Sequence, residues 1–174
     1  INGVCLTIAE LSGNLATFQL STETLTKSTL GGLKSSSPVN VERAMKAADR
    51  FGGHFVLGHI DGIATIKTIK RQGQFADIEF AAEPELLSQM VVKGSVAIDG
   101  ISLTIASMDE RSFSVALIPQ TLKKTTLGTA KVGDAVNIET DIIVKTVKSQ
   151  MASAFGGLPK EQPLTVERLR QLGF

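Results

Sequence analysis

A single thiol is the most reactive side chain of the sequence. Cys5 is the only cysteine among 174 residues and lies in the segment NGVCLT. A thiol can add to an electrophilic carbon or orient a hydroxide ion, so Cys5 is a candidate for nucleophilic chemistry. The alternative is a small buried hydrophobic residue, which is the usual role of a free cysteine. Because no second cysteine is present for an internal disulfide, we expect a reducing, cytoplasmic setting.

Four other polar residues could support such a thiol. His54 and His59 lie five residues apart in GGHFVLGH, but a zinc ion would need further ligands, so we expect no metal site. His59, between two glycines, is either an acid–base or ligand-contacting group or a histidine in a turn. Lys93 is either an exposed loop residue or a contact for an anion or carbonyl group. Asp141 follows the last predicted strand, where capping a helix is the simpler role.

Composition excludes several classes of protein. Eighteen basic and 17 acidic residues leave a net charge of +1, which argues against a dedicated nucleic-acid-binding protein. Hydrophobic residues make up 43% of the chain, enough for a packed core. No apolar run approaches the roughly 20 residues that a membrane-spanning helix needs. We therefore expect neither nucleic acid nor membrane as a partner.

The sequence contains an internal repeat. When the chain is shifted by 97 positions, residues 1–43 align with residues 98–140 without a gap, and 17 of the 43 positions are identical. A single register over this length indicates two copies of one structural unit. The copies differ at polar positions: Cys5 aligns with Ser102 and Asn2 aligns with Asp99. Such divergence is typical of a duplicated fold that keeps one copy for chemistry and one for binding.

Each unit is predicted to be β-structure. Segments 4–11, 15–20, 101–108 and 113–118 are rich in β-branched and apolar residues, with hairpin turns at 12–14 and 109–111. Each unit closes on a short strand, at 39–42 or 136–139. Close spacing of short strands favours small closed barrels. Between the copies we expect helices at 44–51 and 84–90 and a hairpin at 72–73.

The repeat also makes the two units unequal in length. The second unit begins near Phe55, and its first 43 residues, 55–97, have no counterpart before Ile1. We therefore expect about 43 residues to be missing from the front of the first unit, although half a repeat could also be sufficient. From Asp141 the pattern is helical, with Ile143, Val147 and Met151 at four-residue spacing. This helix is either an oligomer contact or packs on the chain's own barrels, and a last short helix is predicted at 165–174.

The motifs resemble those of the riboflavin synthase family, whose members contain two lumazine-binding barrels. The likeness covers residues 1 to about 150 and rests on these segments: NGVCLT, STETL, LGGLK, VNVERA, GGHFVLGHIDG, KGSVAIDGISLT, LIPQTL and VNIETD. One departure is SSSPVNVER, where the second copy keeps Gly133-Asp134 before the strand, and it should affect only a turn. The resemblance implies an all-β fold of two similar small Greek-key closed barrels plus a C-terminal α-helix. The units are residues 1–52, 53–140 and 141–174.

The resemblance also implies a reaction. Two molecules of 6,7-dimethyl-8-ribityllumazine exchange a four-carbon unit, giving riboflavin and 5-amino-6-ribitylaminouracil without a cofactor. The site lies between the first barrel of one subunit and the second barrel of a neighbour, in a homotrimer that could associate with lumazine synthase. A non-enzymatic lumazine or flavin carrier on the same fold is the alternative, and an oligomeric scaffold without ligand is a third interpretation.

The resemblance assigns roles residue by residue. The implied catalytic residues are Cys5, His59 and Asp141. The implied substrate-binding residues are Cys5, Leu6, Thr7, Gln19, Leu20, Ser21, Thr22, Glu23, Thr24, Gly58, His59, Ile60, Lys93, Ser102, Leu103, Thr104, Ile118, Pro119, Gln120, Thr121, Leu122 and Lys123.

Overall fold

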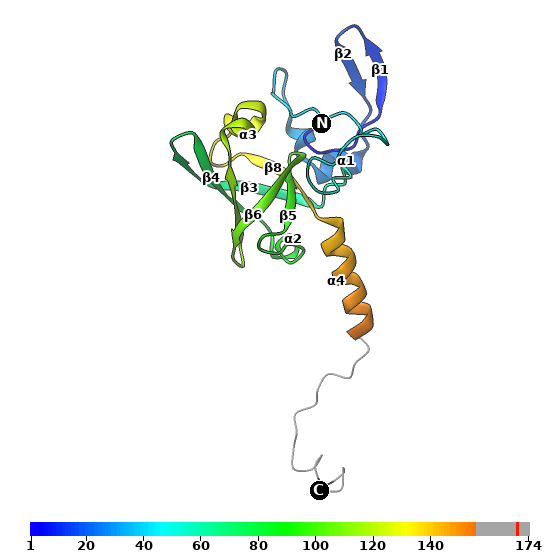
Figure 1. The fold of residues 1–174 in the computed structure, drawn as a ribbon. Helices are drawn as coiled ribbons and strands as arrows, with labels where there is room; N and C mark the ends of the chain where they lie inside the picture. The colour runs from blue at the N-terminus through cyan, green and yellow to red at the C-terminus, as the bar shows by residue number, and fades with distance from the viewer. Residues whose placement is uncertain (156–169, 171–174) are drawn as a thin grey trace.

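The second unit forms a closed barrel of six antiparallel strands (Figure 1). The computed structural model describes residues 1–155 and Arg170. Around the barrel the strands follow the order β3-β4-β7-β6-β5-β8. Their bounds are β3 Gly62–Gln72, β4 Phe75–Ala81, β5 Ser95–Ile98, β6 Ile101–Met108, β7 Ser112–Leu117 and β8 Ala135–Thr140. Short helices α2 (Pro84–Leu87), α3 (Pro119–Lys124) and η2 (Thr126–Gly128) connect them.

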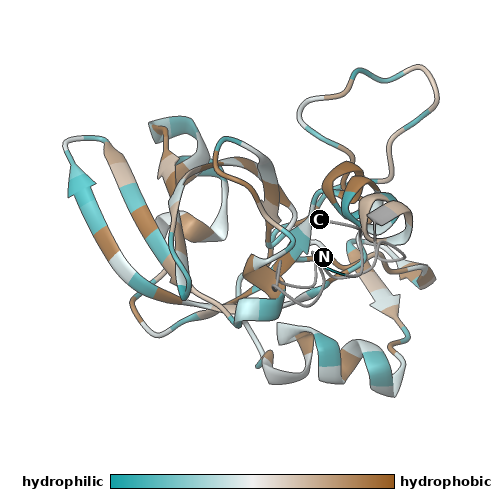
Figure 2. Cartoon of the chain, turned by 90° about the horizontal axis from the view of Figure 1, so that it is seen from below, coloured by the Kyte–Doolittle hydropathy of each residue, from teal (hydrophilic) through white to brown (hydrophobic). Residues whose placement is uncertain are grey.

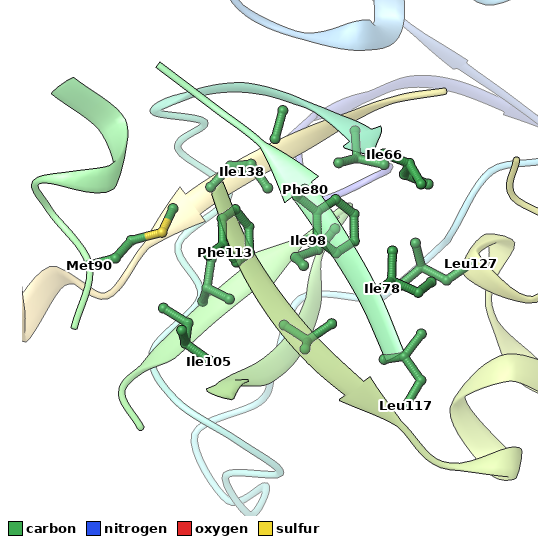
Figure 3. Packing of buried hydrophobic residues seen from close by; sticks show 14 of the residues in the cluster. Ile66, Ile78, Phe80, Met90, Ile98, Ile105, Phe113, Leu117, Leu127 and Ile138 are labelled. Atoms are coloured by element: carbon green, nitrogen blue, oxygen red, sulfur yellow. The ribbon is translucent and has the colours of Figure 1, made fainter. Parts of the chain in front are cut away.

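Alternating side chains close the barrel around one core. In β4 the residues Ala76, Ile78 and Phe80 are buried, whereas their neighbours along the strand are more exposed. Figure 2 shows the corresponding alternation of hydrophilic and hydrophobic bands along the barrel strands. Side chains from different strands meet in the interior, where Phe80 and Phe113 stack with ring centroids 5.2 Å apart (Figure 3). This period-two burial is what fixes the register of each strand.

The predicted hairpin turns are confirmed. β1 (Ile8–Ser12) pairs with β2 (Leu15–Phe18) through a two-residue turn at Gly13, whose φ is +57°. β3 and β4 are joined at Gly73, with φ of +59°. The β6–β7 turn is held by Asp109, whose Oδ1 accepts hydrogen bonds from the N–H groups of Arg111 and Ser112 at 2.8 and 2.7 Å. Positive φ explains the glycines, because other residues rarely adopt it.

The first unit repeats the order of the second but does not close. β1, β2, α1 (Thr22–Lys27) and η1 (Thr29–Gly32) correspond to β6, β7, α3 and η2. The prediction of two closed barrels is therefore met only in the second unit. There, β6 and β7 pair with β5 and β4, and β8 pairs with β3 and β5. Those partner strands come from residues 62–98, which have no counterpart among the described residues of the first unit, and residues 39–42 do not form the predicted strand.

The two helices predicted between the units have different outcomes. Residues 44–51 are not helical, so that prediction was wrong: a single turn forms in which Asp49 Oδ2 accepts from the Lys46 N–H at 2.8 Å. The segment is exposed, and a short helix without a packed face is marginal in water. The helix predicted at 84–90 is present as α2 but ends at Leu87. The two bonds after it, from Gln89 and Met90, span only three residues.

The C-terminal helix is confirmed as α4 (Ile142–Phe155), which points away from the barrel (Figure 1). Its stripe of Ile143, Val147 and Met151 is 54%, 51% and 53% exposed, so the stripe does not pack on the chain's own barrel. Lys145 ties the start of α4 to the barrel through the Asp61 carboxylate, at 2.8 Å. The short helix predicted at 165–174 lies outside the described residues. No described helix has the length and apolar character needed to cross a membrane.

A side chain of the first unit bonds to the backbone of the second. Asn40 donates from Nδ2 to the carbonyl oxygen of Asp99 at 3.1 Å, and its Oδ1 accepts from the Thr126 N–H at 2.9 Å. Its own backbone N–H donates to Asn2 Oδ1 at 2.7 Å. One amide side chain therefore satisfies a donor and an acceptor of the other unit.

An asparagine of the second unit makes the equivalent pair of hydrogen bonds to the backbone of the first. Asn137, which is completely buried, donates from Nδ2 to the carbonyl oxygen of Asn2 at 2.9 Å. Its Oδ1 accepts from the Thr29 N–H at 2.7 Å, and its backbone N–H donates to Asp99 Oδ1 at 2.8 Å. Each of these three bonds matches one made by Asn40, with both the donor and the acceptor residue displaced by 97 positions. The two units are thus joined by a reciprocal exchange of asparagine side chains.

The dipeptides Asn2-Gly3 and Asp99-Gly100 form the contact between these asparagines. All four residues have positive φ, between +46° and +82°, which asparagine, aspartate and glycine tolerate best. A Cβ on Gly3 would lie 2.5 Å from the Gly100 nitrogen, and a Cβ on Gly100 would lie 2.9 Å from Gly3 Cα. Glycine is required here because the two backbones touch.

We call this contact between the two units, formed by Asn40, Asn137 and the dipeptides 2–3 and 99–100, the joint. Asp99 should make its stability depend on pH. Burial raises the pKa of its carboxyl from 3.8 to about 6, opposed by the hydrogen bond from the Asn137 N–H. The native state then holds a proton that the unfolded state has lost, so this contribution is complete below pH 3.8 and disappears as the pH rises through 6. The corresponding loss is on the order of 3 kcal/mol. Asp99→Asn should match the parent near pH 4 and exceed its stability near pH 7 in urea titrations.

The repeat supplies the matched control. Asn2→Asp places a carboxyl at the equivalent buried position of the first unit and should introduce the same loss of stability at neutral pH. A stability difference between Asp99→Asn and the parent that is constant from pH 4 to 7 would contradict this account.

Candidate functional site

Cys5 lies on the surface against the backbone of Gly58. The thiol residue is exposed, so the alternative of a buried hydrophobic cysteine is wrong. Its backbone N–H donates to the carbonyl oxygen of Gly58 at 3.0 Å. Gly58 has a φ of +83°, and a Cβ there would lie 2.5 Å from Cys5 Cβ. Only glycine allows this approach, which leaves the thiol accessible while its backbone is held.

A buried carboxylate holds the other side of Gly58. Glu139 on β8 is 2% exposed and accepts from the N–H groups of Leu57 and Gly58, at 2.7 and 2.9 Å. Glu139 is not among the predicted site residues, but it is one of the 17 identities between the copies, where it matches Glu42. That identity was the available signal, because a charged residue in an otherwise buried strand needs a partner.

Ser102, which replaces Cys5 in the second unit, contacts His54. The distance from Ser102 Oγ to His54 Nδ1 is 2.8 Å, and the His54 backbone N–H donates to the same oxygen at 3.3 Å. Burial lowers the pKa of His54, with Asp141 and Glu139 opposing that shift. His54 Nε2 is buried and has no hydrogen-bond partner among the described residues. The spacing of the two histidines raises only a metal site for His54 and does not predict its contact with Ser102.

Segment 53–58 therefore reaches equivalent positions of both units. Gly53 lies so close to Ser102 that a Cβ on it would collide with the hydroxyl, as a Cβ on Gly58 would collide with Cys5. The segment before β3 thus packs against both Cys5 and Ser102.

The other predicted catalytic residues are not bonded to the thiol. His59 is exposed directly after Gly58. Asp141 caps α4, since its Oδ1 accepts from the Ile143 N–H at 2.9 Å, as the simpler alternative predicted. Among the described residues, no hydrogen bond joins the side chains of Cys5, His59 and Asp141. Lys93 is exposed with φ of +66°, and its backbone N–H donates to Ile105.

The predicted substrate-binding residues occupy equivalent segments of the two units. Residues 5–7 precede β1, and residues 102–104 lie on β6, paired with β5. Residues 19–24 include the first turn of α1, where Ser21 Oγ accepts from the Thr24 N–H at 3.1 Å, and residues 118–123 include most of α3. Cys5, Ser102 and Thr104 are exposed, so a ligand can reach them from the surface.

A shallow depression of about 180 Å³ adjoins one of these segments. Its lining residues are Gln72, Phe75, Ala76, Asp77, Ala116, Leu117 and Ile118. Pockets that enclose small molecules usually measure roughly 300–1,000 Å³. This depression is smaller than that, and Ile118 is the only predicted substrate-binding residue in its lining.

Comparison with known proteins gives one consistent family. Residues 1–44 and 57–141 match the lumazine binding domain. The chain is 44% identical over its full length to riboflavin synthase of Actinobacillus pleuropneumoniae, covering 80% of that protein. It is 43% identical to riboflavin synthase of Escherichia coli strain K12 over 157 residues, covering 87% of the chain and 74% of that protein.

Solved structures share the fold. The crystal structure of LumP complexed with riboflavin has a TM-score of 0.73 and 26% identity, covering 80% of this chain and 75% of that one. LumP complexed with 6,7-dimethyl-8-(1'-D-ribityl) lumazine gives a TM-score of 0.71 at 23% identity, covering 80% and 74%.

The close approach of Gly58 can be tested through the single thiol. Gly58→Ala should displace the loop from Cys5 and raise the rate of Cys5 alkylation by iodoacetamide several-fold, because the backbone bond that holds the residue is lost. Gly133→Ala is the control: Gly133 has a φ of +94° but no atom within 4 Å of an added Cβ. Equal alkylation rates for the two variants would show that strain alone, and not contact with Cys5, is what matters at Gly58.

Proposed function

The chain belongs to the riboflavin synthase family, and we propose that it catalyses the dismutation of 6,7-dimethyl-8-ribityllumazine. One lumazine gives up a four-carbon unit and becomes 5-amino-6-ribitylaminouracil. The other accepts it and becomes riboflavin. Donor and acceptor are the same compound, so a duplicated fold offers one similar binding unit to each.

The observation that carries this proposal is the exposed thiol of Cys5 against the loop at Gly58. A thiol adds readily to an electrophilic ring carbon, and it can leave again when the four-carbon unit is transferred. The adjacent His59 is exposed and within the same loop, where it can exchange protons with the ring or with water. Ser102 at the equivalent position offers only hydrogen bonding, which suits the unit that binds the second lumazine.

We assign residues 1–52 to a first lumazine-binding unit and residues 53–140 to a second. The backbone at 5–7, before β1, and the part of β6 at 102–104 would supply donors and acceptors for the uracil-like edge of the ring. Hydroxyl groups at the start of α1 and near α3 suit the ribityl chain. The productive site would combine the first unit of one subunit with the second unit of a neighbour, as the family resemblance implies.

A carrier function on the same fold is the second candidate. It is favoured by the likeness to LumP, whose crystal structures contain lumazine, flavin mononucleotide or riboflavin. A carrier would bind lumazine without consuming it. Mixing the protein with dimethylribityllumazine separates the two, because riboflavin fluorescence develops only if turnover occurs.

Cys5→Ser should lower kcat strongly and leave lumazine affinity nearly unchanged. The second unit already has serine at this position, so the side chain fits, and losing an interaction made mainly in the transition state lowers kcat without weakening binding. Fluorescence titration measures affinity and riboflavin formation measures turnover. An unchanged kcat would reject Cys5 as the nucleophile.

We propose that the exposed stripe on α4 holds the subunits of a homotrimer together. Val147→Glu/Met151→Glu should then dissociate the assembly in light scattering, since burying unpaired charges costs several kcal/mol. Ser149→Glu/Ser153→Glu adds the same charge on the opposite, exposed face of the helix and should leave the mass unchanged. A trimer that survives the first pair of substitutions would exclude the stripe as the contact.

A further inference from the structure

We propose that Glu139 is a positioning residue for the thiol of Cys5, acting across the joint between the two units. The carboxylate stands on the barrel of the second unit, whereas the thiol belongs to the first. The link between them is the peptide backbone at Leu57 and Gly58. The catalytic part of this inference rests on the proposed function, but the positioning itself does not.

The carboxylate is fixed on the rigid part of the molecule. Glu139 lies on β8, which pairs with β3 on one side and β5 on the other, directly opposite Ala97. It is 2% exposed, and each of its two oxygens accepts one backbone N–H. A carboxylate that accepts two hydrogen bonds in a buried place holds its donors strongly, because bonds to charged groups are stronger than neutral ones.

Gly58, which Glu139 holds, is also the residue that contacts Cys5. Gly58 donates its N–H to Glu139 Oε2 and accepts the Cys5 N–H with its carbonyl oxygen, at 2.9 and 3.0 Å. With no side chain at Gly58, nothing separates the loop from Cys5. If the carboxylate did not fix Leu57 and Gly58, the acceptor for Cys5 would move with the loop.

The first unit has a carboxylate at the equivalent position that does not hold a loop. Glu42 corresponds to Glu139 at the 97-residue spacing, yet it is exposed and makes no hydrogen bond among the described residues. The two residues have the same chemistry and the same position in their units. The difference in contacts predicts different effects of the same substitution.

The experiment compares Glu139→Gln with Glu42→Gln in the full chain. The amide of glutamine keeps one acceptor and turns an NH₂ group toward the second N–H. Amide hydrogen exchange at Leu57, Gly58 and Cys5 should accelerate about tenfold or more in Glu139→Gln. Exchange at Ile78 and Val115 in the barrel core should not change, and Glu42→Gln should behave as the parent at all five amides.

Turnover gives the second measurement. Glu139→Gln should lower kcat by roughly 10- to 100-fold, because small misplacement of a reacting group is costly, with KM changed much less. Glu139→Asp, which keeps the charge but shortens the reach, should lose kcat similarly.

Three results would overturn the proposal: unchanged exchange at Cys5, core amides that accelerate as much as the loop, or equal losses from Glu42→Gln. A parent protein that forms no riboflavin would refute the proposed function. The exchange data would then still decide whether Glu139 positions Cys5.

Discussion

Two asparagine side chains, exchanged between the repeated units, hold the candidate site in place. Asn40 and Asn137 each supply a donor and an acceptor to backbone groups of the opposite unit. A buried amide or carbonyl left without a partner costs roughly 1–3 kcal/mol, so neither asparagine can be exchanged for an apolar residue without loss on both sides of the joint. Cys5 and Ser102 each lie three residues beyond Asn2 and Asp99. The contact between the units therefore fixes the positions of the Cys5 thiol and the Ser102 hydroxyl at the surface.

Strand closure, unlike the contact between the asparagines, depends on partner strands that, among the described residues, are found only in the second unit. The same hairpin, helix and short 3₁₀ turn recur in both copies, but β6 and β7 are completed by β5 and β4, whereas β1 and β2 pair only with each other. The exposed apolar residues Leu11 and Leu15, at 68% and 75%, show the consequence. In the closed unit Met108, the equivalent of Leu11, packs against the barrel core. Local sequence sets the elements, and neighbouring strands decide whether they are buried.

The repeat made much of the fold predictable. A constant offset of 97 residues located both hairpins, and apolar periodicity located α4 and its stripe. The helix predicted at 44–51 failed because its larger apolar residues, Met45 and Phe51, are not buried against either unit and stay more than half exposed. For the candidate site, residue type alone points to Cys5, because the chemistry of a thiol is carried by its own side chain. It was not predictable where a residue acts through backbone contacts: the two bonds of Glu139 and the contact of His54 with Ser102 depend on tertiary approach.

Asymmetry between the copies is what turns a duplicated binding fold into a candidate catalyst. The segment before β3 presents a glycine to the thiol and a histidine to the hydroxyl, so the two equivalent positions have different surroundings. At Cys5 the side chain is left open and only the backbone is held, which suits a nucleophile that must reach its substrate. At Ser102 the hydroxyl is already engaged by His54 Nδ1, which fixes its direction and suits a group that binds without reacting. The asparagine joint fixes these two environments relative to each other. A reaction between two copies of one compound needs two different environments, because one molecule must give the unit that the other receives.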